Sequence, residues 1–258
     1  MPAARATLAL GPGEEAQSLT LAHASDSGEA LFIVGTTRAP ASSDREPSEG
    51  RLLVLRAVVD AADAQGGGAL EQVSVTQVGG CPYAVVALSL AAGAQGYVAT
   101  AVNSQVGVWA LGADGSLSLS ATWGGAFVAY TLAAGEDEGT LVVGDALRSV
   151  TLLRYTAPAS APMQGRLDEV ARDYRSRYML GVAPLAGGSE LLGAETDLNL
   201  FTLTRDEGAA REGRLGDAGV LEARGQWHLG EMVSRFRPGA PALSLSLLDD
   251  DKHDSSSG

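Results

Sequence analysis

Apolar and polar residues alternate in short runs along this chain, and one arrangement of them recurs. Three segments carry it: GYVATAVNSQVGVWALGADG from Gly96, TLVVGDALRSVTLLRYTAP from Thr140 and ELLGAETDLNLFTLTRDEG from Glu190. In each, an apolar run ends at a small residue, a short polar reversal follows, and a second alternating run stops at Gly or Pro. The pattern predicts two antiparallel strands joined by a tight hairpin. In the second copy, Gly144 is expected to adopt a backbone conformation that other residues resist.

The spacing of this repeat is typical of propeller blades. The aligned positions Tyr97, Leu141 and Leu191 lie 44 and 50 residues apart, and a fourth copy begins at Leu31 with a longer polar reversal. Self-similarity every 40 to 50 residues or so, with strands throughout, indicates a β-propeller. We therefore expect an all-β fold built from WD40-like blades of four antiparallel strands. At about 45 residues per blade, the chain predicts an incomplete ring of about five blades.

The remaining segments refine this domain organisation. Leu167 to Tyr174 (LDEVARDY) is compatible with a short helix, but the neighbouring copies favour an outer strand. Residues 1–240 are expected to form the partial propeller, and the acidic, Ser-rich residues 241–258 a disordered tail. No apolar run approaches the roughly 20 residues that a membrane span requires, so no membrane partner is expected.

Composition narrows the classes of partner. Net charge is −13, and Lys252 is the single lysine, which disfavours direct binding of nucleic acid by this segment because phosphates require clustered cations. Glycine occurs 33 times, in keeping with many tight reversals. The lone cysteine, Cys81, excludes an internal disulfide and indicates a reducing compartment.

Candidate catalytic and metal-binding groups are scattered. The three histidines, His23, His228 and His253, have no partner at metal-ligand spacing, so no metal site and no cofactor is expected. The acidic run 249–254 is interpreted as a solvated tail rather than a weak cation site. Cys81 is interpreted as a partly buried thiol rather than a nucleophile. Without a GxSxG or Walker-type motif, the chain is predicted not to be an enzyme.

Propeller loops gather at the rims, where they select partners. Phe127, Tyr130, Tyr178 and Met232 lie beside glycine-rich or acidic turns. Large apolar side chains in such places belong either to the core or, when they recur at equivalent blade positions, to a patch for a partner helix or loop.

Four stretches together resemble one family. They are VVGDALRSVTLLRY (Val142 to Tyr155), EVARDY, LLGAETDLNLF and WHLGEMVSRF. They are similar to the third propeller of the damage-specific DNA-binding protein 1 family, the three-propeller adaptors of cullin-4 ubiquitin ligases. The likeness runs from about Leu19 to Arg237. The large subunit of the cleavage and polyadenylation factor and the propeller subunit of splicing factor 3b share this architecture.

The resemblance implies a non-catalytic scaffold that binds the substrate-receptor proteins of cullin-4 ligases in the nucleus or the cytoplasm. The remaining propellers of a full-length adaptor are implied as further partners, and DNA repair and protein ubiquitination as the context. The family's receptor-facing residues fall on Asp44, Glu46, Val128, Tyr130, Ala146, Tyr178, Met232 and Ser234. Three of these depart from the family: Ala146 replaces a bulkier apolar residue, Tyr178 a tryptophan and Ser234 an asparagine. An RNA-processing scaffold and an unrecognised propeller enzyme are the alternative functions.

Overall fold

A computed structural model describes residues 6–25, 27–39, 46–59, 68–90, 96–158, 164–185, 188–206 and 219–237. Every regular element in these ranges is a strand. The strands are β1 (Glu14–His23), β2 (Ala30–Arg38), β3 (Gly50–Val59), β4 (Gly68–Val78), β5 (Pro82–Leu88), β6 (Tyr97–Val102), β7 (Gln105–Leu111), β8 (Leu117–Trp123), β9 (Ala129–Ala134), β10 (Thr140–Asp145), β11 (Ser149–Thr156), β12 (Arg166–Arg172), β13 (Met179–Pro184), β14 (Glu190–Glu195), β15 (Asn199–Asp206) and β17 (Gly219–His228).

These strands form four blades of four strands, which confirms the all-β propeller prediction. The blades are β1–β4, β5–β8, β9–β12, and β13–β15 with β17, and within each the strands are antiparallel. The third and fourth blades merge into one eight-stranded sheet through a two-residue parallel pairing of β12 with β17. The described part of the chain thus holds four blades where about five were expected. Long connections explain the difference, since residues 39–49 and 60–67 both fall inside the first blade.

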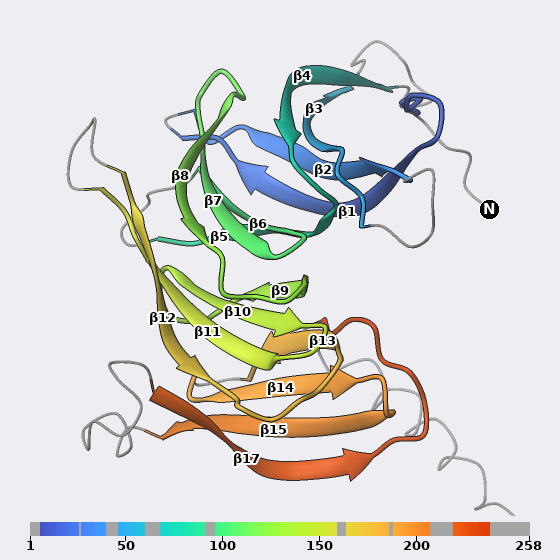
Figure 1. Ribbon diagram of the computed structural model, residues 1–258. Coiled ribbons are helices and arrows are strands. Elements are labelled where there is room, and N and C mark those ends of the chain that lie inside the picture. Colours follow the sequence, from blue (N-terminus) through green and yellow to red (C-terminus); the bar gives the residue numbers. More distant parts are fainter. Residues whose placement is uncertain are drawn as a thin grey trace, which may run out of the picture.

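The blades follow one another in an arc (Figure 1). The first strand of each blade lies innermost, so that β1 contacts β5, β5 contacts β9, and β9 contacts β13. Two of these inner strands are rich in small residues, as AYTLAA in β9 and MLGVAP in β13 show. Small side chains let neighbouring backbones approach where the blades converge.

Three apolar clusters fill the spaces between successive blades. Between the first two, Ile33 and Val54 lie against Val85 and Val98, and all four are buried. Equivalent clusters join the second blade to the third and the third to the fourth. Each strand contributes alternate residues to such a cluster, as the period of two dictates.

Several local predictions can be compared with these elements. Val142 to Tyr155 forms the β10–β11 hairpin, and Leu167 to Arg172 lies in strand β12 rather than in a helix. The predicted tail, residues 241–258, lies outside the described residues. Among the described residues, no helix is long and apolar enough to cross a membrane.

Candidate functional site

At one end of the blade strands lie four of the predicted partner-binding residues: Val128, Tyr130, Ala146 and Tyr178. Because the strands alternate in direction, the connections that enter the inner strands meet the hairpin turns that join the second and third strands of each blade (Figure 1). We call this end the rim. It comprises the connections 79–83, 124–130 and 173–178 and the hairpin turns 103–104, 146–148 and 196–198.

Three tyrosines form a ladder along the rim, one at the start of each of three successive inner strands. The ring centroids of Tyr83 and Tyr130 are 5.5 Å apart, and those of Tyr130 and Tyr178 are 6.1 Å apart in an edge-to-face arrangement. These separations are favourable for aromatic pairs. Tyr178 is 43% exposed and closes the ladder on the fourth blade. The ladder therefore offers a continuous aromatic strip across three blades.

The environment of Tyr83 disfavours ionisation of its hydroxyl. Burial raises the pKa of Tyr83 to about 12, and the nearby Cys81 and the Glu46 carboxylate add to the effect. At neutral pH the phenol is protonated, as an ordinary tyrosine is, and it can donate as well as accept a hydrogen bond. Glu46, which is exposed, places a negative charge beside the first tyrosine of the ladder.

A buried carboxylate holds the rim together at the third blade. Asp145 accepts hydrogen bonds from the backbone N–H groups of Leu147 and Arg148 at 2.7 and 3.0 Å, and from that of Phe127 at 2.6 Å. A backbone bond from Ala146 N to Val128 O, 3.0 Å long, ties the hairpin to the same connection. An aspartate that follows a glycine at a strand end suits such a turn, because its side chain reaches the N–H groups two and three residues on. Hairpin and connection are thus fixed to each other.

Beneath Tyr178 lies a buried ionic network. The Arg177 guanidinium donates to Glu195 Oε1 at 2.7 Å and lies 3.8 Å from Asp173 Oδ2. It also stacks 4.1 Å from the centroid of the Phe201 ring. Asp173 accepts a further hydrogen bond of 2.7 Å from Ser149 Oγ. Because these charges are paired and covered, they position the 173–178 connection and do not face a partner.

The structure brings Val128, Tyr130, Ala146 and Tyr178 together at the rim. Ala146 is only 5% exposed, whereas its neighbour Leu147 is 47% exposed, so Leu147 is the apolar side chain that this hairpin presents. Asp44 lies outside the described residues.

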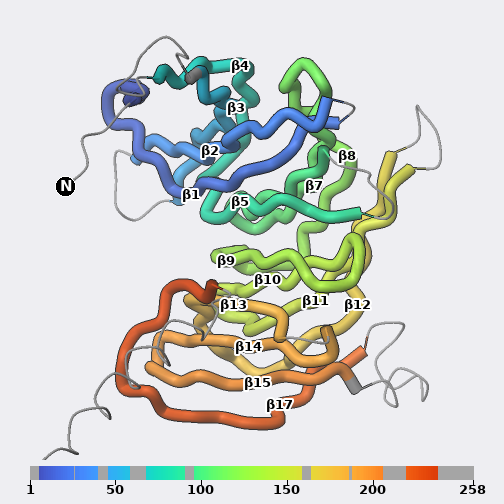
Figure 2. The backbone as a smooth tube through the Cα atoms, turned by 180° about the vertical axis from the view of Figure 1, so that it is seen from behind, coloured from blue at the N-terminus to red at the C-terminus, as the bar shows by residue number. Residues whose placement is uncertain are grey.

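Met232 and Ser234 lie on a strap, residues 229–237, which returns from β17 along the rim end of the fourth blade to β13 (Figure 2). The N–H groups of Leu229 and Gly230 donate to the carbonyl of Leu198 at 2.9 and 3.3 Å. At the far end of the strap, the Phe236 ring lies over the backbone of Gly181 in β13. Met232 and Ser234 are both exposed.

The resemblance to the family did not indicate Tyr83 or Leu147, which the structure also places at the rim. A signal for Tyr83 was present, because CPYAVVALSL places a tyrosine just before or at the start of an apolar run, as FVAYTLAAG and RSRYMLGVAP do. Leu147 carried no such signal: its exposure follows from the way Asp145 folds the turn.

In the described part of the chain, neither a reactive thiol nor a set of metal ligands is found. Cys81 is buried, and burial raises the pKa of its thiol to about 11, so little thiolate forms near neutral pH. Within the same residues, no group of three or more His, Cys, Asp or Glu side chains is arranged to hold a metal ion.

Fold and rim together define a β-propeller scaffold. The chain belongs to the family described as the CPSF A subunit region, whose model matches residues 3–245. It is 33% identical to DNA damage-binding protein 1 of Oryza sativa subsp. japonica over 226 residues, which are 86% of this chain and 18% of that protein. DNA damage-binding protein 1a of Arabidopsis thaliana is 32% identical, with coverages of 83% and 18%, and DNA damage-binding protein 1 of Solanum lycopersicum is 32% identical, with coverages of 88% and 19%. The chain therefore spans less than a fifth of the length of these relatives.

Proposed function

We propose that this chain is a non-catalytic interaction scaffold whose rim binds substrate-receptor proteins of a cullin-4 ubiquitin ligase in the nucleus. The observation that carries the proposal is the tyrosine ladder, since aromatic side chains at equivalent positions of successive blades form a ready anchor strip. The proposal fits the likeness to DNA damage-binding protein 1.

The chemistry of the rim specifies the kind of segment that binds there. Tyr178, Phe127 and Leu147 are exposed, and together they offer an apolar strip. Glu46 adds a negative charge at the first blade. The complementary partner is an amphipathic helix or loop with an apolar face and a basic edge.

A second candidate is an RNA-processing scaffold. It is supported by the description of the matching family, which names the CPSF A subunit region. On this alternative the same rim binds cleavage and polyadenylation or splicing factors instead of ligase receptors.

The experiment that tests these proposals is affinity capture from cells, with the 258-residue chain as bait and the remaining propellers of a full-length adaptor supplied in trans. Recovery of propeller-type receptors together with cullin-4 supports the ligase role. Recovery of polyadenylation or splicing factors without cullin-4 supports the alternative, and recovery of neither contradicts both.

A matched pair of variants links the captured partner to the ladder. Tyr178→Ala is expected to weaken binding by about 1–3 kcal/mol, as for an interface anchor. Tyr174→Ala is the control, because Tyr174 lies in the same connection and is 55% exposed but has no ring contact in the ladder. Equal effects of the two substitutions would argue against the ladder as the docking surface.

A further inference from the structure

The first and fourth blades lie at the two ends of the arc (Figure 1), and each packs against one neighbouring blade. Outside their own blade, β1, β2 and β3 make their main contacts with β5, and β13 makes its main contacts with β9 and β10. We call the face of the first blade that points away from the second blade the first open face. The face of the fourth blade that points away from the third is the last open face.

The first open face carries large apolar side chains. Ala22 of β1 belongs to the buried cluster between the first and second blades. Because successive side chains of a strand point to opposite faces, its neighbour Leu21 lies on the first open face. Leu19, Leu21 and Val75 are 53%, 47% and 38% exposed there. The strand register adds two partly exposed residues of β2 to the same face, Phe32 and Val34.

The last open face is similar. Phe201 of β15 belongs to the buried cluster between the third and fourth blades, so Leu200 and Thr202 lie on the last open face. The register pairs Leu200 with Trp227 of β17 and Thr202 with Leu192 of β14. Trp227 is 70% exposed. An end repeat that meets no neighbour ordinarily has a polar outer face, whereas both end blades of this arc expose large apolar side chains.

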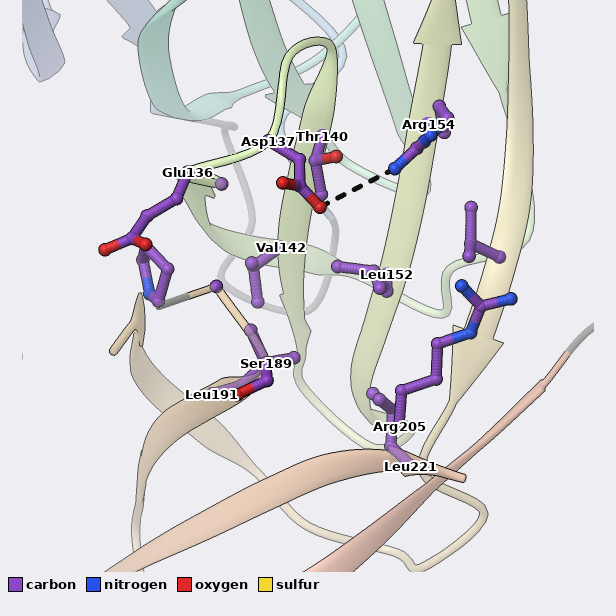
Figure 3. Close-up of a pocket in the computed structure, with 14 residues that line it drawn as sticks. Glu136, Asp137, Thr140, Val142, Leu152, Arg154, Ser189, Leu191, Arg205 and Leu221 are labelled. Carbon is purple, nitrogen blue, oxygen red and sulfur yellow. Dashed lines mark ion pairs between the residues drawn. The ribbon is translucent and has the colours of Figure 1, made fainter. Parts of the chain in front are cut away.

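The two open faces are the halves of a contact that the arc already makes three times. In each case, the face of one blade that points forward along the chain packs against the face of the next blade that points backward. Figure 3 shows part of one such contact, where Val142 and Leu152 of the third blade share an apolar cluster with Leu191 and Leu221 of the fourth. The last open face points forward and the first open face points backward, so one fits the other as successive blades do.

The positions of the exposed side chains agree with such a contact. Equivalent strands meet where blades pack, as β1 with β5 and β9 with β13 show. Trp227 lies on the outermost strand of its blade in the half nearer the rim, and Val75 has the same place in the first blade. Leu192 lies on the second strand in the half away from the rim, as Phe32 does.

We propose that two copies of this chain join head to tail, with the last open face of each on the first open face of the other, and close a ring of eight blades. Twice the four blades of one copy is within the range of roughly four to eight blades at which propellers close. Head-to-tail contacts of this kind give a closed ring when the rotation between the units completes a circle. The second contact forms between copies that are already joined, and this linkage strengthens the pair.

The mass of the 258-residue chain in solution tests the proposal. In size-exclusion chromatography with light scattering, at chain concentrations up to about 0.1 mM, we expect about 53 kDa, twice the 26.3 kDa of one copy. A monomer at the highest concentration would overturn the proposal, and so would open polymers that grow with concentration.

Two variants and their mixture test the head-to-tail arrangement. Leu21→Glu on the first open face and Trp227→Glu on the last are each expected to be monomeric, because both contacts of the ring would bury an unpaired charge. Their mixture is expected to form a pair with one copy of each, identified by native mass spectrometry, because the intact last face of one copy meets the intact first face of the other. With one contact instead of two, this pair should dissociate about tenfold or more readily than the parent.

The matched control is Leu119→Glu, because Leu119 is 48% exposed on β8 of the second blade and lies on neither open face. It is expected to form the dimer as the parent does. Leu19→Glu repeats the test at a second exposed position, and far-UV circular dichroism checks that each variant is folded. A dimer that survives both substitutions on the first open face, or a mixture of folded variants that stays monomeric, would refute the head-to-tail contact. None of these outcomes depends on what the rim binds.

Discussion

A Cβ atom added at Gly144 is expected to perturb the contact between the third and fourth blades. Gly144 was expected to need an unusual backbone conformation, and that reason is wrong, because its φ does not lie in the positive region. The structure gives a different reason. A Cβ at Gly144 would lie 2.4 Å from Cγ2 of Thr131 and 3.0 Å from both Cβ of Met179 and Cγ1 of Val182.

The cost of Gly144→Ala follows from these distances. Overpacking a well-packed interior costs about 1–3 kcal/mol, because neighbours must leave their rotamers or the strands must separate. Alanine also restricts the unfolded chain more than glycine does, and this effect stabilises the folded state by about 0.4–1 kcal/mol. We therefore expect a net destabilisation of about 1–2 kcal/mol. Gly144→Val adds two further methyl groups to this crowded space and is expected to cost about 3 kcal/mol or more.

A second substitution removes the closest obstacle. Thr131→Ser deletes the Cγ2 atom that the new Cβ would meet, and by itself it costs up to about 1 kcal/mol for the lost methyl contact. In the Thr131→Ser background, Gly144→Ala is expected to cost at least about 1 kcal/mol less than in the parent. The difference is the coupling energy of a double-mutant cycle.

Urea unfolding of the four proteins, followed by tryptophan fluorescence and far-UV circular dichroism, measures this coupling. Gly225→Ala is the matched control, because its Cβ would meet only Thr202 Oγ1, at 3.4 Å, and its φ is not positive. It is expected to be neutral or slightly stabilising. Strictly additive free energies for Gly144→Ala and Thr131→Ser would refute the steric explanation.

Three further predictions concern single groups. The thiol of Cys81, with its pKa raised to about 11, is expected to react with iodoacetamide at pH 8.5 about a hundredfold more slowly in the folded chain than in urea, and equal rates would contradict the assigned burial. Arg51 Nε lies 2.5 Å from Glu14 Oε1, and this interaction lowers the pKa of Glu14 from 4.5 to about 2. The stabilisation that this interaction gives, about 1–3 kcal/mol, is therefore fully present above about pH 4.5 and is lost as the pH falls toward 2. In urea unfolding, Glu14→Gln is expected to be less stable than the parent at pH 7, and its free energy of unfolding should fall less steeply as the pH is lowered. Asp145→Ala leaves three backbone N–H groups without their acceptor and is expected to cost about 3 kcal/mol or more in the same assay, whereas Asp145→Asn, which keeps one oxygen, should cost less.

The sequence predicted the second and third strands of the blades better than the first. Strand β10 is apolar, β11 is longer and begins to alternate, and the two flank a polar turn, so their pattern is visible in one chain. The inner strands β9 and β13 contain more small residues, with AYTLAA and MLGVAP, because space near the axis is limited. Small residues carry little hydrophobic periodicity, and for this reason the inner strands gave no clear signal.

The structure places some of the residues indicated by the resemblance at the rim. The resemblance indicated Tyr130 and Tyr178, and the structure adds Tyr83 as the third member of their ladder. At the β10–β11 hairpin it indicated Ala146, whose side chain is buried, because the backbone bonds that Asp145 accepts turn Leu147 outward instead. Which residue of a turn faces solvent depends on such contacts between distant segments, and no single-chain pattern records them.

The spacing of the ladder depends on the same contact that Gly144 controls. Tyr130 and Tyr178 are the immediate sequence neighbours of Thr131 and Met179, the residues that a side chain at Gly144 would displace. A methyl group at this position is expected to push β9 and β13 apart and so to lengthen the 6.1 Å distance between the two rings. We therefore expect Gly144→Ala to weaken partner binding at the rim although Gly144 faces away from solvent, and Thr131→Ser to restore it. Gly225→Ala, which leaves the contact between the inner strands intact, is expected to bind as the parent does. If Gly144→Ala lost stability but kept full affinity, the partner would not use the ladder's spacing.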